Sequence, residues 1–180
     1  MGTRQKREAG CMIQIYCGDG KGKTTAAVGA AVRAAGSGLR VVFAQFLKDG
    51  SSSEIVALRA LGIDCRFAAE TYALFSRPTP EKQARLRAAY NELLRTLAAD
   101  AADYDMLVLD EVLDALQLSL ADEACMQPLL ALAQGTDREL LLTGRQAPPA
   151  IAGAAHYISR ITAVRHPYAS GTPARRGIEY

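Results

Sequence analysis

The sequence predicts an α/β fold, with a doubly wound, mostly parallel sheet of five or six strands and helices on both of its faces. Two features predict it. Short apolar runs alternate along the chain with longer segments whose apolar residues recur at helical spacing. One run, residues 39–46, is almost continuously apolar, which is typical of a parallel strand covered on both faces. Right-handed crossovers between such strands give a doubly wound sheet.

The first strand and the first helix flank a glycine-rich loop. An apolar run at residues 12–17 precedes the stretch GDGKGKTT, and an alanine-rich helix is expected over residues 23–35. Glycines let backbone N–H groups converge on an anion, while the helix N-terminus and a lysine add positive charge. The stretch therefore predicts a polyphosphate site and a RecA-like P-loop NTPase fold, the alternative being an ordinary glycine turn. The residues expected to contact the nucleotide are Gly18, Asp19, Gly20, Lys21, Gly22, Lys23, Thr24 and Thr25.

The loop is one residue shorter than the common phosphate-loop pattern, which places four residues between its two glycines. Three residues separate Gly18 from Gly22. Counting from Cys17 restores the spacing, but a cysteine then stands where the first glycine belongs.

Capping residues and turn residues predict the elements that follow. Glycines end the first helix, strand 39–46 comes next, and the polar loop 47–53 lies at the carboxyl end of that strand. Ser53 can cap a helix over 54–61, and a glycine ends this helix before a short strand at 63–67.

The second half of the chain continues the alternation after an irregular segment at 68–78 that is expected to be a loop. A Thr-Pro-Glu sequence at 79–81 is typical of a helix start, and the apolar spacing after it predicts a helix that ends at 99–102. The remaining expected elements are a strand at 104–110, helices at 112–118 and 120–133, a strand at 139–143, one or two helical turns within 147–154 and a strand at 157–165. Prolines and glycines in residues 166–180 predict no regular structure.

Length and composition favour one domain. A chain of 180 residues with 49% hydrophobic content can bury one core, so we expect a domain over residues 11–180 behind a flexible basic tail, residues 1–10. A net charge of +2 does not predict a nucleic-acid partner. Two histidines and four scattered cysteines do not predict zinc, and the first apolar run is too short for a signal peptide or a membrane span. These features predict a cytoplasmic protein with reduced thiols.

Two carboxylates end the apolar run MLVLD. Burying Asp110 and Glu111 at the end of a parallel strand is costly unless a cation or strong donors lie nearby. In phosphate-loop proteins that cation is Mg²⁺, although a simple helix-capping role is the alternative. Ligands of such sheets bind at the carboxyl ends of the strands, where we also expect the loops at 18–25, 45–53, 68–78 and 143–145.

Polyphosphate binding alone leaves three classes of function open. A hydrolase or kinase attacks phosphorus, a RecA-like module uses the nucleotide to change shape, and a third class attacks carbon with triphosphate as the leaving group.

Six sequence stretches favour the third class. The chain resembles the ATP:corrinoid adenosyltransferase family in its glycine loop and in the stretches that follow it in order. These are GDGKGKTTAA at 18–27, AVRAAGSG at 31–38, AQFLK at 44–48, VLDE at 108–111, TGR at 143–145 and VRHPY…GIEY at 164–180.

The resemblance implies a reaction and roles for these residues. The family transfers the 5′-deoxyadenosyl group of ATP to the Co(I) of a corrinoid, and triphosphate departs. Lys23 would neutralise the phosphates, and Thr24 with Asp110 or Glu111 would hold Mg²⁺, so Lys23 and Glu111 are the candidate catalytic residues. Arg145 would contact the nucleotide, unless it only forms a surface salt bridge. The resemblance also implies a homodimer and an electron-donating flavoprotein partner.

The corrinoid side departs from the family pattern. Family members commonly place a G-F-x-W sequence beside the corrinoid, whereas this chain has no tryptophan. Tyr72 and Phe75 are the candidate replacements, with ordinary packing as the alternative. We also hypothesise that the short loop holds triphosphate so that the 5′ carbon, rather than the terminal phosphorus, is open to attack.

Overall fold

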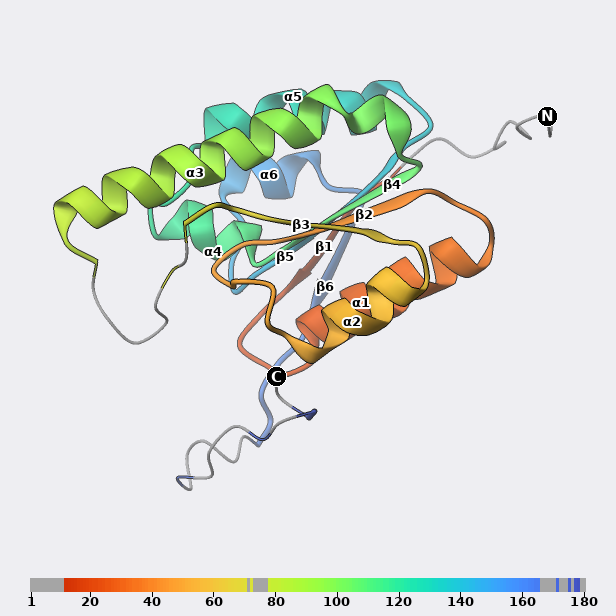
Figure 1. Cartoon of the computed structure of the whole chain (residues 1–180), viewed down its shortest axis with the longest axis horizontal. Coiled ribbons are helices and arrows are strands. Elements are labelled where there is room, and N and C mark those ends of the chain that lie inside the picture. Colours follow the sequence, from red (N-terminus) through yellow and green to blue (C-terminus); the bar gives the residue numbers. More distant parts are fainter. Residues whose placement is uncertain are drawn as a thin grey trace.

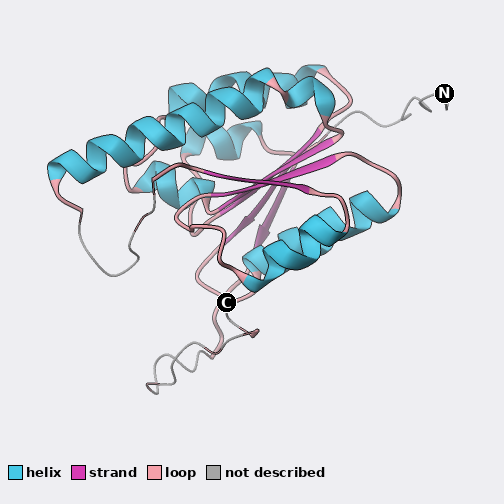
Figure 2. Ribbon diagram, viewed as in Figure 1, coloured by secondary structure: helices cyan, strands magenta, loops and turns pink. Residues whose placement is uncertain are grey.

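A computed structural model describes residues 12–70, 72, 78–165, 171, 175, 177 and 178. The expected tail at 1–10 and the candidate Phe75 lie outside these residues, as does most of 166–180. Within them, strands alternate with helices in the predicted order (Figures 1 and 2). The strands are β1 Ile13–Cys17, β2 Val41–Gln45, β3 Asp64–Phe67, β4 Met106–Asp110, β5 Glu139–Thr143 and β6 Tyr157–Arg160. The helices are α1 Lys23–Gly36, α2 Ser53–Ala60, α3 Pro80–Ala99, the 3₁₀ turn η1 Ala101–Asp103, α4 Val112–Gln117, α5 Glu123–Gly135 and α6 Pro149–Ala154.

The six described strands form one sheet in the order β3-β2-β4-β5-β1-β6, and every pair in it is parallel. Helices α1 and α2 cover one face, while α3, α4, α5 and α6 lie on the other (Figure 1). The α/β fold with helices on both faces is thus confirmed.

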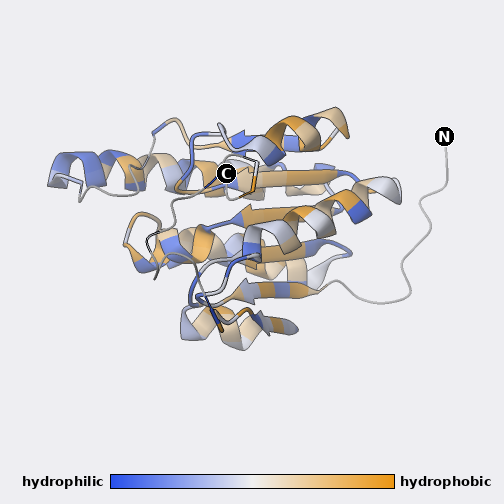
Figure 3. Ribbon diagram, turned by 90° about the horizontal axis from the view of Figure 1, so that it is seen from below, coloured by the Kyte–Doolittle hydropathy of each residue, from blue (hydrophilic) through white to orange (hydrophobic). Residues whose placement is uncertain are grey.

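Each face has its own apolar core. On one face the alanines of α1 and residues such as Ile55 and Leu58 of α2 pack against alternate side chains of the central strands. On the other, the apolar stripe of α3 packs with α5 on the remaining side chains of the same strands. Because both faces are covered, β2 and β4 are buried along their whole length, which explains their continuous hydrophobicity (Figure 3).

Two predicted boundaries differ most from the structure. The last strand was expected to run to residue 165, but β6 ends at Arg160 because the chain then turns onto the glycine loop, where the Ile161 carbonyl accepts a hydrogen bond from the Gly20 N–H. The helix expected at 120–133 begins only at Glu123, and Asp122 just before it bonds through its side chain and its N–H to Asn91 of α3. This helix also continues through Pro128 to Gly135.

Among the described residues, none of the helices combines the length and the apolar content that crossing a bilayer would require.

Candidate nucleotide and metal site

The sheet register brings polar side chains together at the carboxyl ends of three neighbouring strands. Gln45 of β2 is paired with Asp110 of β4, and pairing of Leu109 with Leu142 places Thr143 of β5 at the same level. All three polar side chains are completely buried. Burial at this depth requires hydrogen-bond partners, and the three residues supply partners for one another.

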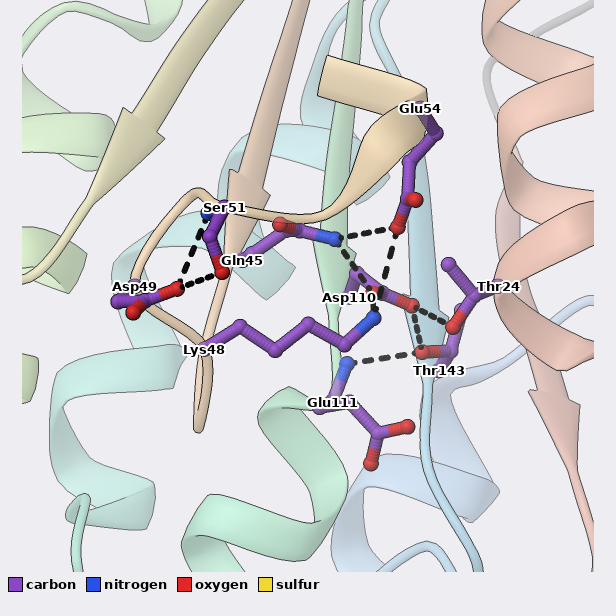
Figure 4. Close-up of polar contacts among 9 residues, drawn as sticks. All are labelled: Thr24, Gln45, Lys48, Asp49, Ser51, Glu54, Asp110, Glu111 and Thr143. Carbon is purple, nitrogen blue, oxygen red and sulfur yellow. Dashed lines mark hydrogen bonds and ion pairs between the residues drawn. The ribbon is translucent and has the colours of Figure 1, made fainter. Parts of the chain in front are cut away.

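Asp110 is the centre of this group (Figure 4). Its Oδ1 accepts hydrogen bonds from the hydroxyls of Thr24 (2.9 Å) and Thr143 (2.8 Å). Its Oδ2 accepts from Lys48 Nζ at 3.0 Å and from Gln45 Nε2 at 3.3 Å. The hydrogen bond from Thr24 ties the start of α1 to the end of β4, and it brings together two of the residues expected to hold Mg²⁺.

Lys48 is a site residue that the sequence reasoning did not select. It follows β2, and its ammonium also lies 3.6 Å from Glu54 Oε1. Burial lowers the pKa of the ammonium, but the charge and hydrogen bond of Asp110 outweigh burial and raise that pKa above its usual value. The stretch AQFLK could have pointed to Lys48 as a site residue, because Gln45 and Lys48 are polar residues at the carboxyl end of a buried strand.

Glu111 has an unusual backbone and an unusual carboxyl group. Its φ of 62° is left-handed, and its N–H donates to the Thr143 hydroxyl at 2.8 Å. Burial raises the pKa of the carboxyl to about 8, helped by a hydrogen bond with Asp114 and by the charges of Asp110 and Asp114. In Figure 4 this carboxylate lies apart from the hydrogen bonds of Asp110.

The glycine loop connects β1 to α1. Gly18 and Gly22 have φ values of 114° and 117°, which side-chain-bearing residues rarely adopt. Gly22 is the N-cap of α1 and has no side chain that could cap the helix, so the first turn of α1 presents its N–H groups to an anion. The Lys23 ammonium lies over this loop and donates to the Gly20 carbonyl at 3.0 Å.

The segment after β6 packs directly on the glycine loop. A Cβ built on Gly18 would lie 2.2 Å from the Ile161 carbonyl oxygen, and one on Gly20 would lie 2.8 Å from the Thr162 carbonyl carbon. The loop N–H groups also bond to the surrounding chain, since Gly18 donates to the Arg145 carbonyl and Gly20 to the Ile161 carbonyl, both at 2.9 Å. Close packing thus requires glycine at positions 18 and 20, whereas position 22 requires glycine only because of its positive φ.

Arg145 lies beside the loop, as expected. Its N–H donates to Asp114 Oδ1 at 3.0 Å, and its exposed side chain lines an open pocket of about 600 Å³. Arg160, Gln117, Gln146, Thr162, Gly18 and Asp19 line the same pocket. A polyphosphate held at the loop would have this positively charged wall beside it.

Tyr72 lies near the loop that follows β2. Its side chain is partly buried against the core that contains α3. Burial raises the pKa of Tyr90 to about 12, and the Tyr72 hydroxyl is close enough to add to that rise. The Tyr90 hydroxyl accepts a hydrogen bond from the Leu47 N–H at 3.0 Å, so Tyr72 and Lys48 lie at the same end of the sheet.

The oxygen groups near Thr24 suit a small hard cation. The Thr24 hydroxyl donates a hydrogen bond to Asp110, which leaves the lone pairs of the Thr24 oxygen available to a metal. Among the described residues, no group of three or more His, Cys, Asp or Glu side chains could hold a metal on its own. This donor set fits Mg²⁺, which is usually bound by one or two protein oxygens together with phosphates and water.

Comparison with known proteins identifies the family of this chain. Residues 9–180 match the family model described as ATP:corrinoid adenosyltransferase BtuR/CobO/CobP. A corrinoid adenosyltransferase of Pseudomonas aeruginosa is 29% identical, with 98% of this chain and 87% of the relative covered. The corrinoid adenosyltransferase CobA of Salmonella typhimurium is also 29% identical, with 98% and 89% covered.

Among solved structures, a KaiC-like protein of Pyrococcus horikoshii has a similar fold. Its TM-score is 0.50 at 16% sequence identity, covering 83% of this chain and 71% of that protein. The similarity supports the α/β fold and carries no functional detail.

A first prediction concerns the packing of the glycine loop. Gly18→Ala should lower the free energy of unfolding by about 2 kcal/mol or more, because the methyl group would overlap the Ile161 carbonyl and the backbone conformation disfavours alanine. Chemical denaturation measures the change. Gly29→Ala in α1 is the matched control, since its Cβ would meet no atom within 4 Å and alanine favours the helix. Equal stability of the two variants would contradict the packing described here.

A second prediction concerns pH and Glu111 in the metal-free protein. Burial raises the pKa of this group, so the folded state holds the proton more tightly than the unfolded state does. Its stabilising contribution is present near pH 4.5 and is lost as the pH rises through about 8, by up to about 1.4 kcal/mol per pH unit. Denaturation from pH 5 to 8 should therefore show Glu111→Gln becoming more stable relative to the unsubstituted protein. A difference that stays constant with pH would mean that Glu111 is ionised throughout.

Proposed function

Because the chain belongs to the ATP:corrinoid adenosyltransferase family, we propose that it transfers the 5′-deoxyadenosyl group of ATP to the Co(I) of a corrinoid. The enzyme class expected from the sequence is confirmed by that membership. In the transfer, an electron pair of cobalt forms the cobalt–carbon bond, and the electron pair of the breaking C5′–O bond leaves with triphosphate. The observation that carries the site assignment is the hydrogen bond from Thr24 to the buried Asp110, formed at the first turn of the helix that follows the glycine loop.

Lys23 and the glycine loop bind the triphosphate in this proposal. Charge gathers on triphosphate as the C5′–O bond breaks, so fixed donors around it stabilise the transition state more than the ground state. The N–H groups of the first turn of α1 and the Lys23 ammonium are such donors. In the resting loop this ammonium bonds to the Gly20 carbonyl, and an anion of higher charge would draw it away.

Thr24 and Asp110 would hold Mg²⁺, with Glu111 beside them. The metal, when bound, screens the charge of the triphosphate. The hydrogen bond of Thr24 fixes the direction of its lone pairs, and the Thr143 hydroxyl holds the same oxygen of Asp110 in place. Glu111 keeps a proton more readily than an ordinary carboxyl group does, which limits the negative charge next to an incoming triphosphate.

Arg145, Tyr72 and Phe75 complete the assignment. In this proposal Arg145 contacts the nucleotide from the pocket wall and Tyr72 contacts the corrinoid, while Phe75, the other candidate, lies outside the described residues. The position of Tyr72 near Tyr90, at the carboxyl end of the sheet, supports its part of the assignment. With the corrinoid on that side, the short loop leaves the 5′ carbon of ATP open to attack by cobalt.

Formation of a Co(I) corrinoid requires a strong reductant. We propose a cytoplasmic enzyme that receives electrons from a flavoprotein and acts as a homodimer. Exposed apolar side chains on the edge strand β6, Tyr157 and Ile158, support the dimer. Sedimentation analysis would distinguish one chain from two.

A third prediction tests the role of Lys23. Lys23→Ala should reduce adenosyl transfer by about a hundredfold or more, because a fixed positive charge on the leaving group is lost. The assay supplies ATP, Mg²⁺ and chemically reduced corrinoid, then follows the light-sensitive cobalt–carbon product and the release of intact triphosphate. Arg95→Ala, an exposed position of α3, is the control and should retain activity. Release of ADP and phosphate would instead favour a hydrolase or kinase, and turnover stimulated by nucleic acid would favour a RecA-like module.

A fourth prediction tests Tyr72. Tyr72→Ala should raise the KM for the corrinoid several-fold and leave the KM for ATP unchanged, because only the corrinoid would lose an aromatic contact. Tyr72→Phe keeps the ring and should behave like the unsubstituted enzyme. Parallel increases in both KM values would indicate that Tyr72 only supports packing.

A further inference from the structure

The Asp110 carboxylate has no acceptor position left for a metal ion. A carboxylate offers about four lone-pair positions, and this one accepts four hydrogen bonds. Two come from threonine hydroxyls, one from the Gln45 amide and one from the Lys48 ammonium. A cation that binds this carboxylate directly, or through a water molecule, must therefore displace one of the four donors.

Lys48 is the donor most easily displaced. Thr143 and Gln45 are completely buried within strands, and the Thr24 bond itself orients a metal ligand. The Lys48 side chain is 23% exposed and has a flexible stem, and its charge repels any other cation at the same carboxylate. When a metal ion takes the place of the ammonium, Asp110 still has a positively charged partner.

The same cluster contains acceptors for the displaced ammonium. Glu54 Oε1 is already 3.6 Å from Lys48 Nζ. Gln45 Oε1 is buried and accepts no hydrogen bond within the described residues, while the amide nitrogen of this side chain is fixed by bonds to Glu54 and Asp110. The backbone before Lys48 is held in place, since Leu47 has a φ of 59° and its N–H bonds to Tyr90. Movement can thus be confined to the lysine stem.

We propose that Lys48 is a resident counter-cation of Asp110 that competes with the divalent metal, so that the metal binds tightly only together with a polyphosphate. The proposal rests on the proposed metal and triphosphate site. The ammonium keeps Asp110 neutralised when the site is empty. A metal ion alone gains too few ligands to displace it, whereas a metal ion that arrives with triphosphate brings additional oxygen ligands and negative charge.

The test compares Mn²⁺ binding with and without inorganic triphosphate, using the electron paramagnetic resonance signal of free Mn²⁺. Lys48→Met should bind Mn²⁺ alone about tenfold or more tightly than the unsubstituted protein, which is within the usual range for coupled ligands. Triphosphate should then improve Mn²⁺ affinity less in the variant than in the unsubstituted protein. Equal Mn²⁺ affinity of the two proteins without triphosphate would overturn the proposal.

Two controls keep the outcome interpretable. Arg40→Met removes a cation paired with Asp105 just before the other end of β4, and it should leave Mn²⁺ binding unchanged. In the double variant Lys48→Met with Asp110→Asn, the gain in affinity should disappear, and persistence of the gain would contradict the role given to Asp110. If the unsubstituted protein binds no Mn²⁺ even with triphosphate, the proposed metal site itself is wrong, which is a different failure.

A second variant and a second measurement test the proposal even if Lys48→Met folds poorly. Lys48→Gln keeps an N–H donor for Asp110 without the charge and should show the same direction of change in Mn²⁺ affinity. Thermal unfolding should show that excess Mn²⁺ raises the Tm of either Lys48 variant more than that of the unsubstituted protein. The absence of a larger rise would count against competition between the lysine and the metal.

Discussion

The buried carboxylate of Asp110 determines how the centre of this molecule is arranged. Taking such a charge out of water is costly, and the cost is offset only when strong donors surround it. Here the donors come from α1, from β2, from the loop after β2 and from β5. A slip of β2, β4 or β5 by one residue would remove at least one of these donors. The same interaction therefore fixes the sheet register and assembles the proposed active site.

The sequence predicts the fold well because the decisive signals are local. Continuous apolar runs, capping residues and the glycine loop each depend on neighbouring residues, and they correctly predict the alternation of strands and helices. Contacts between strands are harder to predict from the sequence. The approach of Lys48 to Asp110 spans 62 positions and depends on how two strands align, so the motif AQFLK alone does not reveal the partner.

The short glycine loop has a physical explanation that spacing alone does not provide. Its first glycines are in close contact with the backbone of Ile161 and Thr162, and Gly20 gives its N–H to that segment. The same contact explains why the last strand ends at Arg160 and not at residue 165, because the chain leaves the sheet there to reach the loop. The short glycine loop and the early end of the last strand are therefore both explained by one contact, between the loop and residues 161 and 162.

This contact has a consequence for the order of events during synthesis. The glycine loop is made before its supporting segment, which follows β6, the last strand within the described residues. β1 also lies between β5 and β6, so neither of its neighbours exists until most of the chain has been translated. The loop therefore remains without its supporting contacts until residues 161 and 162 have been made. Phosphate binding should therefore appear abruptly once residues 161 and 162 have left the ribosome, rather than increase gradually with chain length.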